Sequence, residues 1–348
     1  MTSTANAVAT QVALVTVLVP ARNEADDIAR CLEAVAAQDF PLDRIEVVVV
    51  DGNSSDATIG TAEAALARHP FARSAVVDNP AGSTPSNLNV GLTHARGRYL
   101  CRVDARSVVP TDYVRRCTEV LERRPDVAVV GGSQVAVVGR GRSGVAIARA
   151  LNNPLGMGLA RYRSGRPSGE ADTVYLGCFR TRDLHDVGGW NEAWATNQDF
   201  ELNRRMARRG VIWFESGLSV GYVPRPTISS LAAQYHRFGR WKVRYWRRTG
   251  DRPRPRQVAL MVGPVVGSVT GAAAVVSLAR TPRRLVALAV AALAGMVAIE
   301  SRSAGPDATL VDRAASIMAS AAVAGGWLSG IGRELVRPDS PRSGTSDR

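Results

Sequence analysis

Several residue patterns that would indicate common protein classes are missing from this sequence of 348 residues. The four cysteines (Cys31, Cys101, Cys117 and Cys178) lie far apart, without a CxxC pair and without a histidine cluster beside them. This spacing argues against a structural zinc site and against a disulfide scaffold. We therefore expect buried, reduced thiols.

Two nucleotide-binding motifs are also absent where they would be needed. No GxGxxG follows the first predicted strand, and no GxxxxGK[ST] occurs anywhere in the chain. A dinucleotide oxidoreductase and a P-loop ATPase or GTPase are therefore disfavoured. The apolar run from Val12 to Val19 has no basic region before it and ends at Pro20, so it indicates a buried strand and not a secretory signal.

Lysine is almost missing, since Lys242 is the only one, and arginine supplies nearly all of the positive charge behind the net charge of +13. A basic protein attracts nucleic acid, anionic lipid or phosphorylated ligands. Nine Lys and Arg residues against one acid fall in residues 237–256, beside an apolar tail, and no nucleic-acid motif accompanies them. We expect membrane and phosphorylated partners and no nucleic acid, with a non-enzymatic basic module as an open alternative.

The first 130 residues alternate between short β-branched runs and helical stretches, which predicts βαβ units and a parallel sheet. The predicted strands are Thr16–Val19, Ile45–Val50, Ser74–Val77, Tyr99–Val103 and Val127–Val130. The predicted helices are Ala25–Ala37, Asp56–Arg68, Ser86–Ala95 and Thr111–Arg123. Farther along, we expect strands at Thr173–Phe179 and Ile212–Phe214 and a helix at Asp199–Arg209.

The tail changes composition sharply after residue 256. Val258–Ala279, Leu285–Ile299 and Ala314–Gly332 carry no charge over 22, 15 and 19 residues. A membrane span needs about 20 apolar residues, so we predict two or three membrane-associated helices, with the basic stretch on the cytoplasmic side. A soluble, alanine-rich helical bundle is the alternative.

Polar, acidic turns follow three of the predicted strands. The first strand leads into Arg22-Asn23-Glu24, the second into Asp51-Gly52-Asn53, and the fourth into Asp104. Ligands of open α/β sheets bind outside the carboxyl ends of the strands, so these turns predict one site. There Asp51 would accept hydrogen bonds from a nucleoside, and Asp104 would hold Mn²⁺ or Mg²⁺ against a diphosphate. Taken alone, Asp56 could simply cap the next helix.

The order of these segments resembles glycosyltransferase family 2, whose fold is called GT-A. The resemblance runs from Val15 to Trp241 and rests on VLVPARNEADDIARCLEAV, VVVVDGNSSDAT, RGRYLCRVDARS, GGWNEAWATNQDFELNRRM and QYHRFGRW. It implies an α/β fold in which helices flank a mixed sheet, followed by a C-terminal membrane-helix module. The tail is similar to bacterial members that build exopolysaccharide on lipid carriers, such as succinoglycan glucosyltransferases.

The resemblance also implies a role for individual residues. Asp199 would be the general base, with Glu201 as the rival, and Asp104 would bind a divalent cation. The nucleotide and donor would be held by Pro20, Arg22, Glu24, Asp51, Asn53, Asp56 and Asp104 together with Arg237, Arg240 and Trp241. The acceptor would meet Gly177, Gln198 and Trp241.

One position departs from the family pattern. The second acid of the DxD motif is Arg106 here, and an arginine cannot ligate a cation. Either Asp104 suffices with phosphates and water, or Arg106 takes over part of the cation's charge.

The predicted function is inverting transfer of a sugar from a nucleotide diphosphate donor, expected to be a UDP-sugar. The acceptor would be a hydroxyl of a lipid-linked saccharide or polysaccharide in cell-envelope or exopolysaccharide synthesis. A sugar-phosphate nucleotidyltransferase is the alternative enzyme. We expect a plasma-membrane protein with a cytoplasmic catalytic domain. Its expected parts are a flexible N-terminus (1–12), a catalytic domain (13–235), a basic segment (236–256), the membrane helices (257–333) and a disordered tail (334–348).

Overall fold

The computed structural model describes residues 14–139, 143–153, 167–253 and 309–337. The described residues form two compact units. The first contains the chain up to Val137 and from residue 167 to Val223, and the second contains the remaining described residues. Two of the three predicted membrane segments, Val258–Ala279 and Leu285–Ile299, and the predicted N-terminal tail lie outside the described residues.

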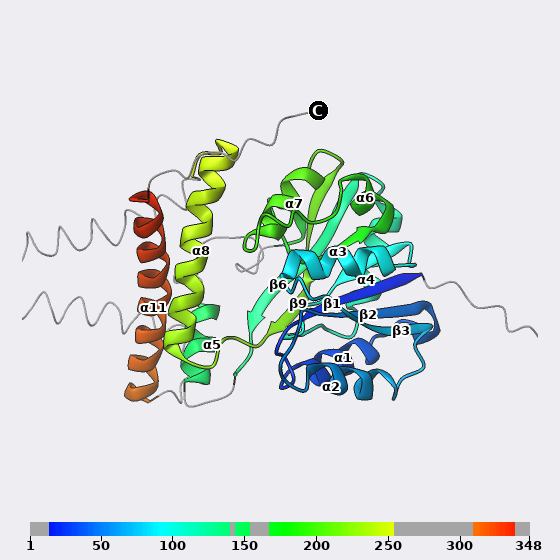
Figure 1. Ribbon diagram of the computed structural model, residues 1–348, viewed down its shortest axis with the longest axis horizontal. Coiled ribbons are helices and arrows are strands. Elements are labelled where there is room, and N and C mark those ends of the chain that lie inside the picture. Colours follow the sequence, from blue (N-terminus) through cyan, green and yellow to red (C-terminus); the bar gives the residue numbers. More distant parts are fainter. Residues whose placement is uncertain (1–13, 140–142, 154–166, 254–308, 338–348) are drawn as a thin grey trace, which may run out of the picture. The chain divides into compact units, whose positions relative to one another are not determined.

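The first unit is a nine-stranded mixed sheet with helices on both faces (Figure 1). Its strands are β1 (Val15–Ala21), β2 (Ile45–Asp51), β3 (Arg73–Asp78), β4 (Tyr99–Arg102), β5 (Ser107–Val108), β6 (Val127–Ala136), β7 (Gly169–Glu170), β8 (Tyr175–Arg180) and β9 (Val211–Tyr222). Its helices are α1 (Ile28–Ala36), α2 (Thr58–Leu66), α3 (Thr84–His94), α4 (Tyr113–Arg123), α6 (Thr181–Asp186) and α7 (Gln198–Met206), with a 3₁₀ turn at Leu42–Arg44.

The strand order is β3-β2-β1-β4-β8-β6-β9-β5, with β7 paired to β9. The pairs β3–β2, β2–β1 and β1–β4 are parallel, while β8 runs antiparallel to both β4 and β6. The sequence predicted this parallel half correctly, because its βαβ alternation is regular. In register, Ala21 on β1 stands opposite Asp51 on β2, so the turns after these strands start side by side.

Two apolar layers hold the sheet between the helices. One layer joins α1, α2 and α4 to one face of the sheet, and the other joins α3, α6 and α7 to the opposite face. The run Val47–Val50 is fully buried because it contributes side chains to both layers. All four cysteines are buried and free of disulfides, as the sequence indicated.

Strand β9 is much longer than the predicted strand Ile212–Phe214. Its first half pairs with β6 up to Phe214, and pairing resumes at Ser219 after a register shift. The polar residues between these halves hid the continuation, in which Leu218 and Val220 are buried alternately. The irregularity brings Gly132 of β6 so close to β9 that an added Cβ would lie 1.9 Å from the Leu218 carbonyl oxygen.

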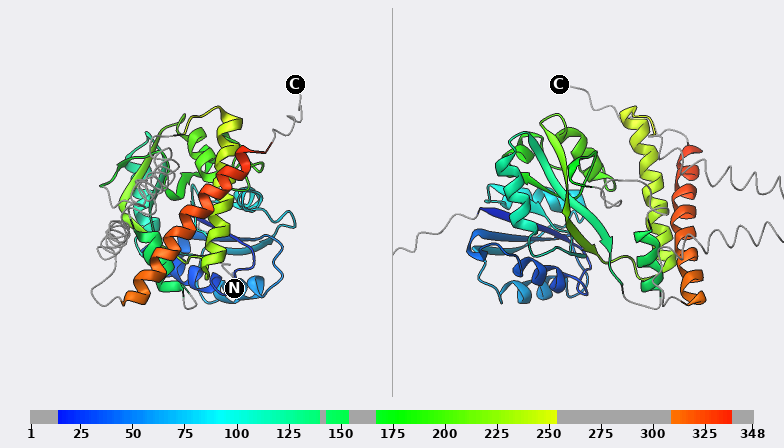
Figure 2. Two further views of the ribbon diagram at one scale, coloured as in Figure 1. Left: turned by 90° about the vertical axis from the view of Figure 1, so that its left-hand side faces the viewer. Right: turned by 180° about the vertical axis from the view of Figure 1, so that it is seen from behind.

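The second unit contains α5 (Gly144–Asn152), α8 (Ile228–Thr249) and α11 (Leu310–Leu335). Helices α8 and α11 lie side by side along most of their lengths (Figure 2). Both helices begin with capping boxes, and α8 ends at Gly250, whose φ of +71° suits glycine. The predicted boundary between residues 235 and 236 falls inside α8, and the predicted tail from residue 334 begins inside α11.

Glycines let α8 and α11 approach each other closely. Gly326 and Gly330 of α11 face the carbonyl oxygens of Ala232 and His236, at 2.5 and 2.1 Å from where a Cβ would stand. Near the end of α11, the buried Glu334 accepts hydrogen bonds from Arg240 and Arg244 of α8. Among the described residues, α11 alone is long and apolar enough to cross a membrane, judged by length and composition.

Candidate active site

The turns that follow β1 and β2 are tied together by hydrogen bonds at the carboxyl edge of the sheet. The Asn23 amide donates to Oγ of Ser54 at 2.8 Å, and the Ser55 amide donates to Oδ1 of Asn23 at 2.8 Å. Asn23 and Asn53 both adopt left-handed backbone conformations, which asparagine tolerates in tight turns. The predicted convergence of these acidic turns is confirmed.

Asp51 and Asp56 accept hydrogen bonds from residues of these turns. Both carboxylate oxygens of Asp51, a residue only 1% exposed, accept hydrogen bonds from Ser54. Asp56 accepts from the amide and hydroxyl of Thr58 and from the Ala25 amide. These hydroxyl and amide donors lower the pKa of Asp56. Both acids therefore have structural partners within the turns.

Two buried asparagines, which the sequence analysis missed, fix the strand ends from the other side. The side-chain amide of Asn87 donates to the carbonyl oxygens of Ala21 and Val50, and Asn79 donates to Oδ1 of Asn87. Gly52 has to be glycine here, because an added Cβ would stand 2.7 Å from the Asn87 amide nitrogen. The other turn residues are less buried: Pro20, the last residue but one of β1, is half-buried, while Arg22 is exposed and donates to the Gly82 carbonyl.

The corner after β4 carries two arginines and one aspartate. Arg102 is a buried cation at the end of β4, and its Nε donates to Oδ1 of Asp104 at 2.7 Å. Its Nη1 also bonds Oδ1 of Asp199, which comes from the first turn of α7. Arg106, at the place of the missing second acid, donates through Nε to both oxygens of Glu24, at 3.0 and 2.7 Å. The two arginines therefore contact three acids: Arg102 contacts Asp104 and Asp199, and Arg106 contacts Glu24.

The sequence analysis missed Arg102, although the signal was present. A charged residue within an apolar strand is costly to bury unless it has partners. Arg102 stands between Cys101 and Val103 in a run that is otherwise fully buried. This signal identifies Arg102 and its neighbour Asp104, but it does not identify Asp199, which lies 97 residues farther along the chain.

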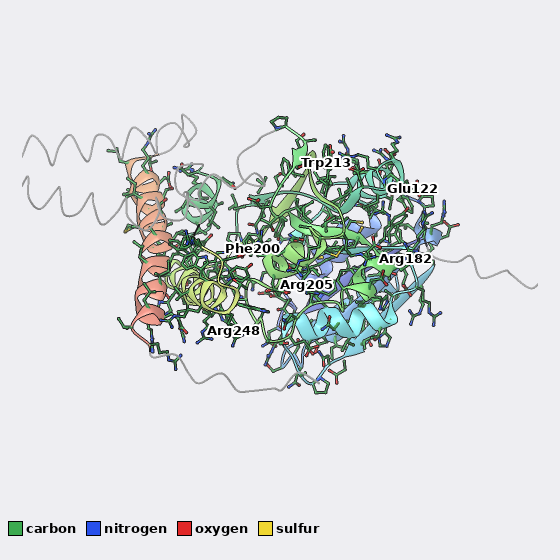
Figure 3. The ribbon with its side chains drawn as sticks, turned by 90° about the horizontal axis from the view of Figure 1, so that it is seen from above. Glu122, Arg182, Phe200, Arg205, Trp213 and Arg248 are labelled. Carbon is green, nitrogen blue, oxygen red and sulfur yellow. The ribbon has the colours of Figure 1, made fainter. Side chains whose placement is uncertain are left out.

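Asp199 and Glu201 have different surroundings, although both lie in the first turn of α7. Glu201 is bound by Arg205, whose Nε and Nη2 each lie 2.8 Å from one of its oxygens. Figure 3 labels Arg205 on this helix. The Asp199 side chain is 49% exposed and also lines a small pocket. Of the two acids, Asp199 is the one available to a substrate.

Protein atoms packed around Asp199 raise the pKa of its carboxyl group, and the negative charge of Asp104 raises it further. The positive charge of Arg102 opposes this rise. A carboxylate with a raised pKa is a better proton acceptor than an ordinary aspartate. The raised pKa suits the predicted role of Asp199 as the base, and that role stays a prediction here.

The pocket beside Asp199 lies between β8 and α7. Its lining includes Arg102, Gly177 and Trp190, and its volume is about 10 Å³. Gly177, expected at the acceptor, is thus brought next to Asp199, while Gln198 begins α7 one residue before it.

Comparisons with known proteins fit this geometry. The sequence model described as Glycosyl transferase family 2 matches residues 16–177. The succinoglycan biosynthesis protein ExoA of Rhizobium meliloti (strain 1021) is 31% identical over 257 residues, which cover 72% of this chain and 75% of that protein. This chain belongs to glycosyl transferase family 2. It is therefore a glycosyltransferase.

A more distant relative of this glycosyltransferase comes from Methanococcus voltae. It is a dolichyl N-acetyl-alpha-D-glucosaminyl phosphate 3-beta-D-2,3-diacetamido-2,3-dideoxy-beta-D-glucuronosyltransferase, 22% identical over 65% of this chain and 71% of that protein. The fold is shared with the mannosyltransferase PcManGT of Pyrobaculum calidifontis, solved with GDP-Man and Mn²⁺. That structure has a TM-score of 0.61, 20% identity, and coverage of 94% of this chain and 88% of that one. The predicted GT-A fold is confirmed.

Three residues predicted for the donor and acceptor lie on α8 of the glycosyltransferase, in the second unit. Arg237 is exposed, and Arg240 donates through Nε to Glu334 at 2.9 Å. The ring of Trp241 lies under the guanidinium of Arg244, 4.9 Å from centroid to Cζ. Their roles toward donor and acceptor stay predictions.

Proposed function

We propose that this glycosyltransferase moves a sugar from a nucleotide diphosphate donor to a hydroxyl of a lipid-linked saccharide or polysaccharide, with inversion at the anomeric carbon. The observation that carries the proposal is the pairing of Asp199 with Asp104 through the buried Arg102. It joins a proton acceptor to the corner where the diphosphate would bind. A UDP-sugar is the proposed donor, and the relatives' names support a saccharide or lipid-linked acceptor.

The reaction is a single displacement. Asp199 takes the proton of the acceptor hydroxyl, whose oxygen forms a bond to the anomeric carbon. The bond from that carbon to the diphosphate oxygen breaks, and its electron pair leaves with the nucleoside diphosphate. Because attack comes from the face opposite the leaving group, the product has the inverted configuration.

The turns after β1 and β2 are proposed to hold the nucleotide, with Pro20, Arg22, Glu24, Asn53 and the two structural acids, Asp51 and Asp56, forming its surroundings. Asn53 is exposed, and so is Arg22. The fixed turn backbone leaves these side chains on one edge, which suits a ligand lying across β1 and β2.

The donor set at Asp104 fits one divalent cation shared with a diphosphate. Its side chain is 33% exposed, and only Oδ1 accepts a hydrogen bond from the described residues. No cluster of three acids, histidines or cysteines occurs among those residues, so phosphate oxygens and water would complete the coordination. Mn²⁺ or Mg²⁺ held by Asp104 would supply positive charge to the departing diphosphate.

We also propose attachment to the plasma membrane, with the catalytic unit in the cytoplasm. Several large apolar side chains of α11 are exposed, among them Leu310, Val311, Met318 and Leu335. Exposed apolar surface of this kind marks contact with lipid or protein. The basic stretch 237–256 suits the cytoplasmic side.

Transfer assays on two variants of neighbouring acids test the base. The purified chain is incubated with UDP-, GDP- and dTDP-sugars and with octyl glycosides or undecaprenyl-diphosphate-linked sugars. Asp199→Asn is expected to lower kcat about 10²- to 10⁴-fold without weakening UDP binding. Glu201→Gln, the matched control on the same helical turn, is expected to keep most of the activity. Full activity in Asp199→Asn would overturn the assignment.

A further inference from the structure

Trp190 is a buried tryptophan with an unused hydrogen-bond donor. It is 1% exposed, and its ring packs edge-to-face on Phe179 with centroids 6.0 Å apart. Its indole Nε1–H forms no hydrogen bond with the described residues. The N–H lies beside Asp199 and opposes the rise in the pKa of that carboxyl group, although the geometry falls short of a hydrogen bond. A buried donor without a partner is destabilising, so this N–H is expected to bind a ligand.

The pocket that Trp190 lines is the size of a single oxygen-bearing group. Its volume of about 10 Å³ is close to what one water or one hydroxyl oxygen requires, and far too small for a sugar ring. The polar part of the lining comes from Trp190, Arg102, Asp199 and Asn203. Arg102 already donates to Asp104 and Asp199, and the side-chain amide of Asn203 donates to Thr173 at 2.9 Å. The rest is mostly apolar, from Val174, Leu176, Phe179 and Leu202.

The backbone beside the pocket is strained. Leu176 has a φ of +47°, in the left-handed region that a leucine rarely adopts. It precedes Gly177 on β8, at the point where the pairing with β6 shifts register. Strained backbone of this kind persists where the surrounding structure imposes the conformation, and it is frequent at functional sites. Leu176 and Gly177 both line the pocket.

A hydroxyl group matches the two facing groups. It has one proton to donate and two lone pairs that accept hydrogen bonds. Asp199 is acceptor-only when ionised, and the Trp190 indole is donor-only. A hydroxyl between them satisfies both, whereas an anion would face the Asp199 carboxylate.

We propose that this pocket seats the reacting acceptor hydroxyl, and that Trp190 is a catalytic residue whose indole N–H donates to its oxygen. As Asp199 takes the proton, the N–H holds the hydroxyl oxygen in place and leaves its second lone pair to attack the anomeric carbon. The oxygen then bonds to the anomeric carbon while the bond to the diphosphate breaks. This inference rests on the proposed function, because it assigns the acceptor side of the same reaction.

The sharpest test removes the N–H and keeps the ring. Site-specific replacement of Trp190 by benzothienylalanine puts sulfur in place of Nε1–H, and Trp190→Phe is the genetically simpler variant. Trp213→Phe is the matched control, since its Nε1 donates to Glu215 at 3.2 Å on β9, away from the pocket. The assay uses the donor and octyl glycoside that give turnover with the unaltered chain.

Both Trp190 variants are expected to lose about tenfold in kcat/KM for the glycoside, the equivalent of one hydrogen bond of about 1.4 kcal/mol. Binding of UDP and of the UDP-sugar, measured by titration calorimetry, is expected to stay unchanged, as is the activity of Trp213→Phe. Unchanged kcat/KM in the benzothienyl variant would overturn the proposal. So would weaker binding of the UDP-sugar relative to UDP, because the pocket would then hold a hydroxyl of the donor. A chain without any transfer activity would instead refute the proposed function.

Discussion

Arg102 joins the two acids on which the proposed chemistry depends. Its guanidinium contacts Asp104 and Asp199 and is almost completely buried. The charge of Arg102 lowers the pKa of Asp199 and so opposes the effect of the Asp104 charge, which raises it. The side chain therefore controls the proton affinity of Asp199 as well as its position.

The pH dependence of transfer reports this control. Burial and Asp104 raise the pKa of Asp199, so kcat/KM for the acceptor is expected to fall with decreasing pH sooner than an ordinary aspartate would dictate. Arg102→Met removes the charge that opposes this rise and is expected to move the acid limb to still higher pH. In Arg102→Lys, which keeps a positive charge, the acid limb is expected at a pH between those of the unaltered chain and Arg102→Met. An acid limb at the same pH in all three proteins would contradict this account.

Gly177 supports the site through its lack of a side chain. An added Cβ would stand 2.3 Å from Cζ of Phe179, whose ring packs on Trp190. Gly177→Ala is expected to cost about 1–3 kcal/mol of unfolding free energy and to lower transfer activity, because Phe179 must move. Gly60→Ala is the control, since nothing lies within 4 Å of its Cβ position in α2. Thermal unfolding measures the stability of the two variants. Equal stabilities would contradict the predicted clash between the added Cβ at position 177 and Phe179.

At the scale of elements, the sequence determined the parallel half of the sheet and missed details of the other half. Strands β1, β2 and β4 were predicted within a few residues because their apolar runs are continuous. The full length of β9 was not predicted, because Glu215 and Ser216 interrupt its apolar pattern at the register shift. The acidic turns were found by their position after strands.

Arg102 and Trp190 show why part of the site escaped prediction. The role proposed for each depends on a residue far away in the sequence. Arg102, for example, donates to Asp199, 97 positions away. An unsatisfied indole N–H can be seen only once the surrounding atoms are in place. Sequence spacing identifies side chains that can do chemistry, but it does not show which hydrogen bonds remain open.

The pairing of α8 with α11 depends on small residues at their contact. Gly326 faces the Ala232 carbonyl oxygen at 2.5 Å from its Cβ position, while nothing lies within 4 Å of that of Gly325. Gly326→Ala is expected to lower the unfolding temperature of the second unit, because the helices must separate slightly. Gly325→Ala should leave it unchanged or raise it, since alanine favours helix. The two variants compared by calorimetry isolate the contact, and a matching loss in Gly325→Ala would refute it.

At the scale of the whole molecule, the chain combines a catalytic sheet with a helical unit. The first unit contains the acids, the buried arginine and the pocket. The second contains the basic helix α8 and the apolar helix α11, which suit a membrane surface. This division suits the proposed transfer from a soluble donor to a lipid-linked acceptor.

The anomeric configuration of the product shows whether the sugar is transferred by a single displacement with Asp199 as the base. The chain is incubated with an α-linked UDP-sugar and its active acceptor, and the new linkage is read by proton NMR while the released nucleotide is identified. A β-linked product and stoichiometric UDP are expected from a single displacement with inversion. An α-linked product would contradict the single displacement at Asp199, and release of pyrophosphate from a nucleoside triphosphate and a sugar phosphate would favour a nucleotidyltransferase instead.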